Sequence, residues 1–181
     1  HGGKFSVLHN FAQMDVLTAT NSDGAVPLGG LLLSDCVLYG TAFAGGFGGH
    51  GTIFSVQTNG SGFNVLHHLT SVDSVTGTNN DGASPCAALT LVSNLLYGTT
   101  AAGGQGAAGT VFSLSTNGSQ FATLRSFAAM AGGMLGGMIS AASACALVSA
   151  RLADLAETQN GFKIQMPAVR FCPWTPFFSK T

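Results

Sequence analysis

The sequence contains very little charge. Only 7% of its 181 residues are Asp, Glu, Lys or Arg, and the only Glu is Glu157. No Lys or Arg occurs between Phe5 and Leu124, and the formal net charge is −1. Because a nucleic-acid-binding surface needs clustered cations, nucleic acid is excluded as an expected partner. Disordered chains are polar and strongly charged, whereas 46% of these residues are hydrophobic, so a folded chain is expected.

Several motifs that carry chemistry are also missing. There is no CxxC motif and no Cys/His cluster, which excludes a structural zinc site. No G-x-S-x-G motif is present, and neither a Lys nor a predicted helix follows the glycine loops at 44–51 and 102–109. Serine-hydrolase elbows, P-loops and dinucleotide-binding turns are therefore not predicted. The four cysteines leave disulfides and buried free thiols both open; they are Cys36, Cys86, Cys145 and Cys172.

What the chain does contain is a tandem repeat with a period of 58 residues. Residues 5–62 are identical to residues 63–120 at 30 of 58 positions, without an insertion. A third copy begins at Phe121, as the first two begin at Phe5 and Phe63, and breaks off after seven residues. A fixed period of this length is typical of repeat arrays and propellers, in which one unit cannot bury its apolar face alone.

Each unit contains four short stretches that favour strands, separated by turn residues. They are Phe5–Phe11, 30–33, 37–41 and 52–56 in the first unit, and Phe63–Leu69, 88–91, 95–99 and 110–114 in the second. The pattern predicts an all-β fold of two four-stranded propeller-like blades plus the start of a third, with a partly helical C-terminal tail. A stacked β-solenoid is the alternative. Two units are fewer than the roughly four to eight blades of a closed propeller.

Asn-Gly pairs predict a hairpin at the end of each unit. Asn59-Gly60 and Asn117-Gly118 stand between two alternating stretches, where a type I′ turn with positive φ at both central residues is expected. The glycine loops are expected to be tight turns at a sheet edge, because glycine adopts positive φ without a steric penalty.

The repeated phrases also resemble those of a known family. They are LYGT(T/A)-x-AGG-x-G-x-x-GT-(I/V)-FS, TNGS-x-F-x-VLH and DGA-x-P, and they recur within residues 4–127. The unit resembles the GloVer repeat, which is found in tandem in large surface or secreted proteins of environmental bacteria. This resemblance implies a repeat array that is secreted or displayed on a bacterial surface. It implies no reaction, since no catalytic residues are established for the family.

The repeat divides the chain into a first unit (1–62, from Phe5), a second unit (63–120), a truncated third (121–127) and a tail (128–181). Residues 137–158 of the tail are predicted to form a helix that covers an exposed sheet edge. Because residues 126–150 carry no charge, a membrane-spanning helix in contact with a membrane is the alternative. Because the composition changes in mid-repeat, a tail produced by a frameshift is an open alternative. Because His1 is not an initiator residue, the chain being a fragment is another.

Two repeat-equivalent pairs of residues are the candidates for a site. By alternation, His9 and His67 each lie on the same face as Phe and Val of their own stretch, and Arg125, which cannot ligate a cation, stands at the third equivalent position. Both histidines are therefore expected to be hydrogen-bonded structural residues. Asp23 and Asp81 each precede Gly and are expected to cap their own turns. With neighbouring Asn residues they could also offer oxygen ligands to Ca²⁺, the one metal that suits this composition, and no other cofactor is expected.

These observations predict a secreted or surface-displayed, non-enzymatic β-repeat protein that acts as a scaffold or binding module for a protein or a glycan. Self-association through exposed strand edges is a further expectation. The alternative is an enzyme: a propeller-type, Ca²⁺-dependent hydrolase of esters or lactones that uses His9, His67, Asp23 and Asp81.

Overall fold

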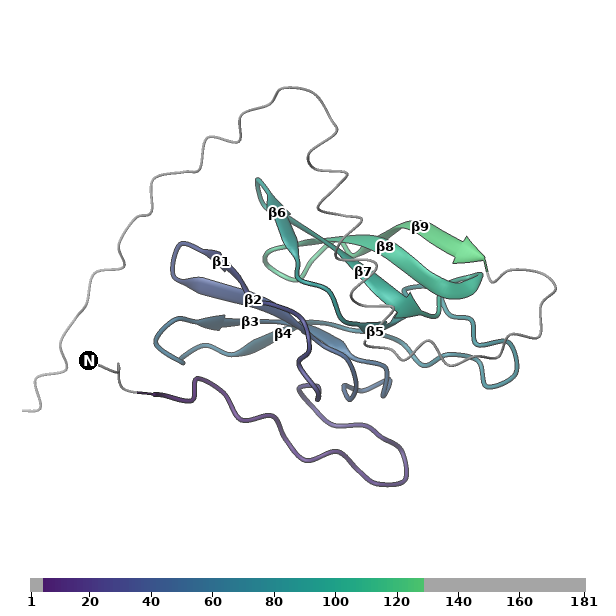
Figure 1. The fold of residues 1–181 in the computed structure, drawn as a ribbon, viewed down its shortest axis with the longest axis horizontal. Coiled ribbons are helices and arrows are strands. Elements are labelled where there is room, and N and C mark those ends of the chain that lie inside the picture. Colours follow the sequence, from purple (N-terminus) through teal and green to yellow (C-terminus); the bar gives the residue numbers. More distant parts are fainter. Residues whose placement is uncertain (1–4, 129–181) are drawn as a thin grey trace, which may run out of the picture.

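A computed structural model describes residues 5–128 of the chain, and the regular structure in that range is all β. The strands form two antiparallel sheets that lie side by side (Figure 1). The first sheet has the order β1-β2-β3-β4, and the second has β5-β7-β8-β9 with β6 also paired to β7. The strands are β1 (Leu32–Ser34), β2 (Val37–Ala42), β3 (Thr52–Gln57), β4 (Asn64–His68), β5 (Ala83–Pro85), β6 (Thr90–Val92), β7 (Leu95–Ala102), β8 (Ala107–Ser115) and β9 (Ala122–Ala128).

The sheets are out of phase with the sequence repeat. Strand β4 belongs to the second repeat unit, yet it pairs with β3 and completes the first sheet. Strand β9 belongs to the third copy and completes the second sheet by pairing with β8. The opening stretch of each unit is therefore the outer strand of the sheet built by the preceding unit.

This phase shift corrects one expected strand. Residues 5–11 contain no strand, because no preceding unit supplies an equivalent of β3 or β8 among the residues that the structure describes. We call residues 5–12 the leading segment. It packs on the first sheet: the ring centroids of Phe11 and Phe54 are 5.4 Å apart. The strands expected at 30–33 and 88–91 are also displaced, by two residues at their first positions, to β1 and β6.

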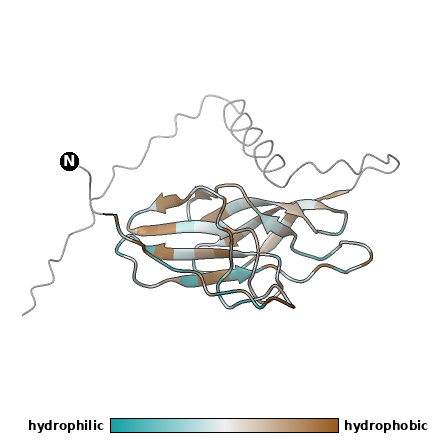
Figure 2. Cartoon of the chain, turned by 60° about the horizontal axis from the view of Figure 1, so that its bottom comes forward, coloured by the Kyte–Doolittle hydropathy of each residue, from teal (hydrophilic) through white to brown (hydrophobic). Residues whose placement is uncertain are grey.

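The hydrophobic core lies between the two sheets. Tyr39, Ile53 and Leu66 face it from the first sheet. The second sheet contributes Leu96, Phe112 and Leu114, and Leu89 precedes β6. Hydrophobic residues run along the strands of both sheets (Figure 2). Because each sheet covers one face of the other, the buried area comes from contact between units rather than from either unit alone.

The glycine of the LYGT phrase makes room for a core phenylalanine. Gly98 pairs with Phe112 across the ladder, and a Cβ on Gly98 would lie 2.4 Å from Cζ of that ring. Gly40 and Phe54 have the same relation, with a distance of 2.6 Å. Glycine within a strand often marks such a close approach, and here it explains why the motif recurs.

The Asn-Gly hairpins are confirmed, but their turn type differs from the expected one. Gly60 has a φ of +83° and Gly118 a φ of +84°, whereas neither Asn59 nor Asn117 has positive φ. The amide of Gly60 donates to the carbonyl of Gln57, and the amide of Gln57 donates to that of Ser61. This is a three-residue loop that ends in a left-handed glycine, the next most common hairpin class after the two-residue turns.

The glycine loops are tight turns, as expected. Gly45 and Gly46 in the first unit and Gly103 and Gly104 in the second all have positive φ. Cys36 and Cys86 are each disulfide-bonded. Within residues 5–128 no helix is long and apolar enough to cross a membrane. The helix predicted at 137–158 lies outside the described residues.

Candidate functional site

The four candidate residues gather into two equivalent pairs. Nε2 of His9 lies 2.9 Å from Oδ2 of Asp23, and Nε2 of His67 lies 2.9 Å from Oδ2 of Asp81. An ionised carboxylate can only accept a hydrogen bond, so Nε2–H of each ring is the donor. Both aspartates are buried and both histidines are half-buried. Nothing in the spacing of the repeat predicted that residues 14 positions apart would pair across a loop.

Each aspartate also accepts hydrogen bonds from the segment that follows its histidine. The amide of Ala12 donates to both carboxylate oxygens of Asp23, at 3.1 and 3.0 Å. The amide and the hydroxyl of Thr70 donate to Asp81. These aspartates therefore join a distant segment to the Asp-Gly turn. The expectation that they cap their own turns was wrong.

The turn is closed by an asparagine instead. Oδ1 of Asn79 accepts from the amides of Gly82 and Gly104, at 2.9 and 2.6 Å. Its Nδ2 donates to the carbonyls of Thr70 and Gly82, at 2.9 and 2.8 Å. Asn21 makes the four equivalent bonds in the first unit. Sequence reasoning considered these asparagines only as calcium ligands, although their identical place two residues before Asp in both units was a usable signal.

The histidine rings join consecutive units. His9 stacks on Phe63, with ring centroids 3.5 Å apart and planes at 6°. His67 stacks on Phe121 in the same way, at 4.0 Å and 9°. In both cases the phenylalanine is the first residue of the following unit. The pair thus connects three parts of the array: the opening stretch of a unit, its Asp-Gly turn and the next unit.

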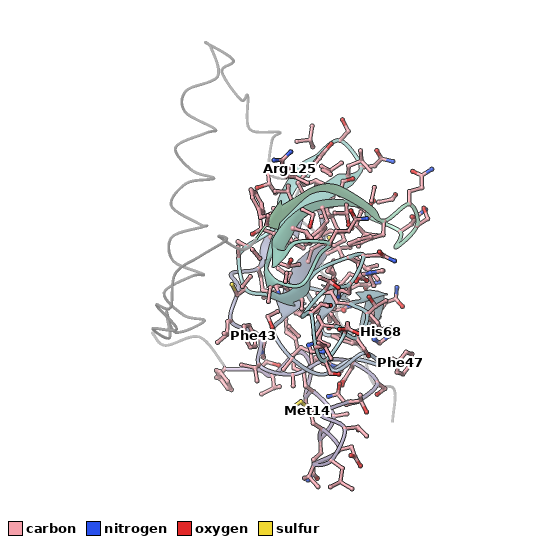
Figure 3. The ribbon with its side chains drawn as sticks, turned by 90° about the vertical axis from the view of Figure 1, so that its right-hand side faces the viewer. Met14, Phe43, Phe47, His68 and Arg125 are labelled. Atoms are coloured by element: carbon pink, nitrogen blue, oxygen red, sulfur yellow. The ribbon has the colours of Figure 1, made fainter. Side chains whose placement is uncertain are left out.

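One histidine contact is particular to the first sheet. Nδ1 of His68 accepts from the amide of Phe47 at 3.2 Å, and the two rings stack with centroids 4.0 Å apart (Figure 3). Burial lowers the pKa of His68, and the neighbouring His67 lowers it further. Both effects favour the neutral ring, which is the form that can accept a hydrogen bond at Nδ1. In the second sheet Ser126 stands in its place and accepts from the amide of Gly106.

The hydrogen bonds of Asp81 make the stability of the fold depend on pH. Burial opposes ionisation of this carboxyl, but the hydrogen bonds from His67 and Thr70 outweigh it and hold its pKa below 3.8. A lowered pKa in the folded state stabilises the fold above the unfolded value, and that contribution is lost as the pH falls through the folded value. We expect Asp81→Asn to lower the melting temperature at pH 6, and the difference from the unmodified chain to shrink as the pH falls from about 4 to about 2. Thermal melts across this range check it, and a difference that stays constant would contradict it.

The pairs do not assemble a nucleophile or a metal centre in the described range. No serine hydroxyl or cysteine thiol within residues 5–128 hydrogen-bonds to His9 or His67. No group of three or more His, Cys, Asp or Glu that could hold a metal ion is found in the same range. Because both oxygens of each aspartate accept N–H bonds, a cation there would have to compete with them.

The fold and the pairs define an all-β repeat protein in which the same contacts recur at each junction between units. A family model described as the Gloeobacter/Verrucomicrobia repeat matches residues 1–149, and the chain belongs to this family. The resemblance seen in the sequence is thereby confirmed. A search of curated proteins finds no match.

Proposed function

We propose that this protein is a non-enzymatic β-repeat module, secreted or displayed on a bacterial surface, that acts as a scaffold or binding module. The observation that carries the proposal is the repetition of the histidine–aspartate pair. A catalytic site is ordinarily a single constellation, whereas both pairs here form the same contacts at successive junctions. Their recurrence suits a structural role in joining units.

The two sheets fit the proposal of propeller-like blades. Each contains a meander of antiparallel strands and is completed by the following unit, as expected for radial repetition. Further units of the same kind would extend the array at both ends.

A repeated surface feature supports binding to a protein or a glycan. Oδ1 of Asp15 accepts from the amides of Leu17 and Thr18, and Oδ1 of Asp73 does the same for Val75 and Thr76. These bonds fix two loops at equivalent positions. Leu17 and Val75 occupy their tips and are 92% and 90% exposed. Held apolar tips at a repeated spacing offer a preorganised contact for a partner, which reduces the entropic cost of binding.

Location outside the cytoplasm is supported by the family resemblance and by the disulfide bonding of Cys36 and Cys86. Disulfides form and persist in oxidising compartments such as the periplasm and the cell exterior.

A hydrolase assay separates this proposal from the alternative, a Ca²⁺-dependent esterase or lactonase. We expect no turnover of simple esters and lactones with Ca²⁺ or with EDTA, and no change in melting temperature between the two. We expect His67→Ala to lower the melting temperature, since it removes the bond to Asp81 and the stack on Phe121. Turnover that requires Ca²⁺ and is lost in His67→Ala or Asp81→Asn would establish the hydrolase instead.

A further inference from the structure

The far face of the second sheet is the one turned away from the first sheet, and within residues 5–128 it lacks the cover that the first sheet has. Leu66 in β4 is 8% exposed because the second sheet packs on it, whereas its equivalent in β9, Leu124, is 54% exposed. Leu69 is fully buried, and its equivalent Phe127 is 46% exposed. Repetition therefore shows what would cover this face: another sheet of the same kind, presented as the second sheet is presented to the first.

The first sheet has an open face too: the one turned away from the second sheet. Leu89 is 4% exposed at the junction between the sheets, but its equivalent Leu31 is 53% exposed. Phe54 on this face contacts Phe11 of the leading segment and is also stacked on Phe63, with ring centroids 5.4 and 5.5 Å away. The residues of these two open faces are therefore the repeat equivalents of the residues that already meet at the junction between the two sheets.

The leading segment occupies the place that β9 of another copy would take. Residues 5–12 read FSVLHNFA and residues 121–128 read FATLRSFA. The leading segment has no ladder partner within the described residues and is held by Asp23 and by ring contacts. Strand β9, in contrast, is hydrogen-bonded to β8. Exchange of the leading segment for β9 of a second copy therefore breaks no sheet hydrogen bonds.

The charge of Arg125 also favours a second copy of this chain as the partner. Arg125 stands where His9 and His67 stand in their units, and each of those rings binds an aspartate 14 residues later. The corresponding position in the third copy is Ile139. Arg125 is exposed on β9 and forms no ion pair with a residue of the 5–128 range (Figure 3). A guanidinium in this place suits the carboxylate that His9 would release, Asp23 of another copy.

We propose that this chain associates head to tail, with β9 of one copy docked on the first sheet of the next in place of the leading segment, and with Arg125 paired to Asp23 of that copy. The proposal rests on the scaffold function proposed above, and the partner that it assigns to the scaffold is a second copy of this chain. The interface is heterologous, because different surfaces of the two copies meet, so it leaves an open end for a further copy.

Sedimentation velocity over about a hundredfold range of concentration tests this, because association follows mass action. We expect species that grow beyond dimers with concentration and shrink with added salt. Arg125→Glu, at an exposed position that should not impair folding, places like charges together and should raise the dissociation constant about tenfold or more. Phe47→Ala, at a position that is 72% exposed and whose repeat equivalent Gln105 is also exposed, should leave association unchanged.

A mixing experiment tests the polarity. Arg125→Glu keeps only the Asp23 end, and Asp23→Asn, which offers no cation to the glutamate of the first variant, keeps only the Arg125 end. Neither should associate alone, and a mixture should stop at dimers. A monomer at all concentrations overturns the proposal and leaves the scaffold function standing. Association that Arg125→Glu does not weaken also overturns it and indicates a different contact between copies.

Discussion

Phe112→Ala should cost about 3–5 kcal/mol of unfolding free energy. The ring is fully buried in the core between the sheets, pairs with Gly98 across the ladder and lies 5.3 Å from Phe121 between centroids. Alanine would leave a cavity where the glycine offers no side chain to fill it, and the backbone of a paired strand cannot collapse into the space.

Urea unfolding measures this loss as a fall in the midpoint at a constant slope. Phe47→Ala is the matched control, because Phe47 is 72% exposed, and it should change the unfolding free energy by about 0.5 kcal/mol or less. Similar losses in the two variants would mean that the junction between the sheets is not the core.

The elements set by local chemistry could be predicted from the sequence. The LYGT and FS phrases lie in β2, β3, β7 and β8, as predicted. Their alternation and β-branched residues favour strands through interactions between residues close in sequence, which the sequence alone reveals. The Asn-Gly hairpins followed for the same reason. Their turn type did not, since the three-residue loop depends on the register that β3 and β4 adopt together.

The elements that depend on a neighbouring unit could not be predicted. Phe5–Phe11 and Phe63–Leu69 have nearly the same pattern, but only the second has a preceding strand to pair with. Identical alternation thus gives a strand in one place and an extended segment in the other. Strand propensity describes how well a side chain fits a pleated surface, and it does not supply the surface.

The candidate site was predicted in part for a similar reason. The repeat spacing singled out His9, His67, Asp23 and Asp81, but it did not indicate that each histidine would find its own aspartate. That pairing comes from the loop between them, which returns the chain over the Asp-Gly turn. The Asn21 and Asn79 bonds fix this loop, and only their three-dimensional arrangement shows that all four bonds of each side chain are used.

Hydrogen exchange at the three repeat-equivalent stretches distinguishes a completed sheet from an unpaired segment. β4 and β9 are hydrogen-bonded to the strands before them, whereas residues 5–11 have no such strand. Because intrinsic exchange rates depend mainly on local sequence and these sequences are similar, a difference in rate reports hydrogen bonding. Amides that open only with their sheet are protected by its local stability, whereas unpaired amides exchange almost freely.

The most direct measurement is therefore hydrogen exchange by mass spectrometry on peptides that cover 5–11, 64–68 and 122–128, at a concentration where the chain is monomeric. If the opening stretch of each unit completes the preceding sheet, amides in 64–68 and 122–128 should exchange about a hundredfold or more slowly than those in 5–11. Equal protection of all three stretches, or free exchange at 122–128, would contradict that arrangement.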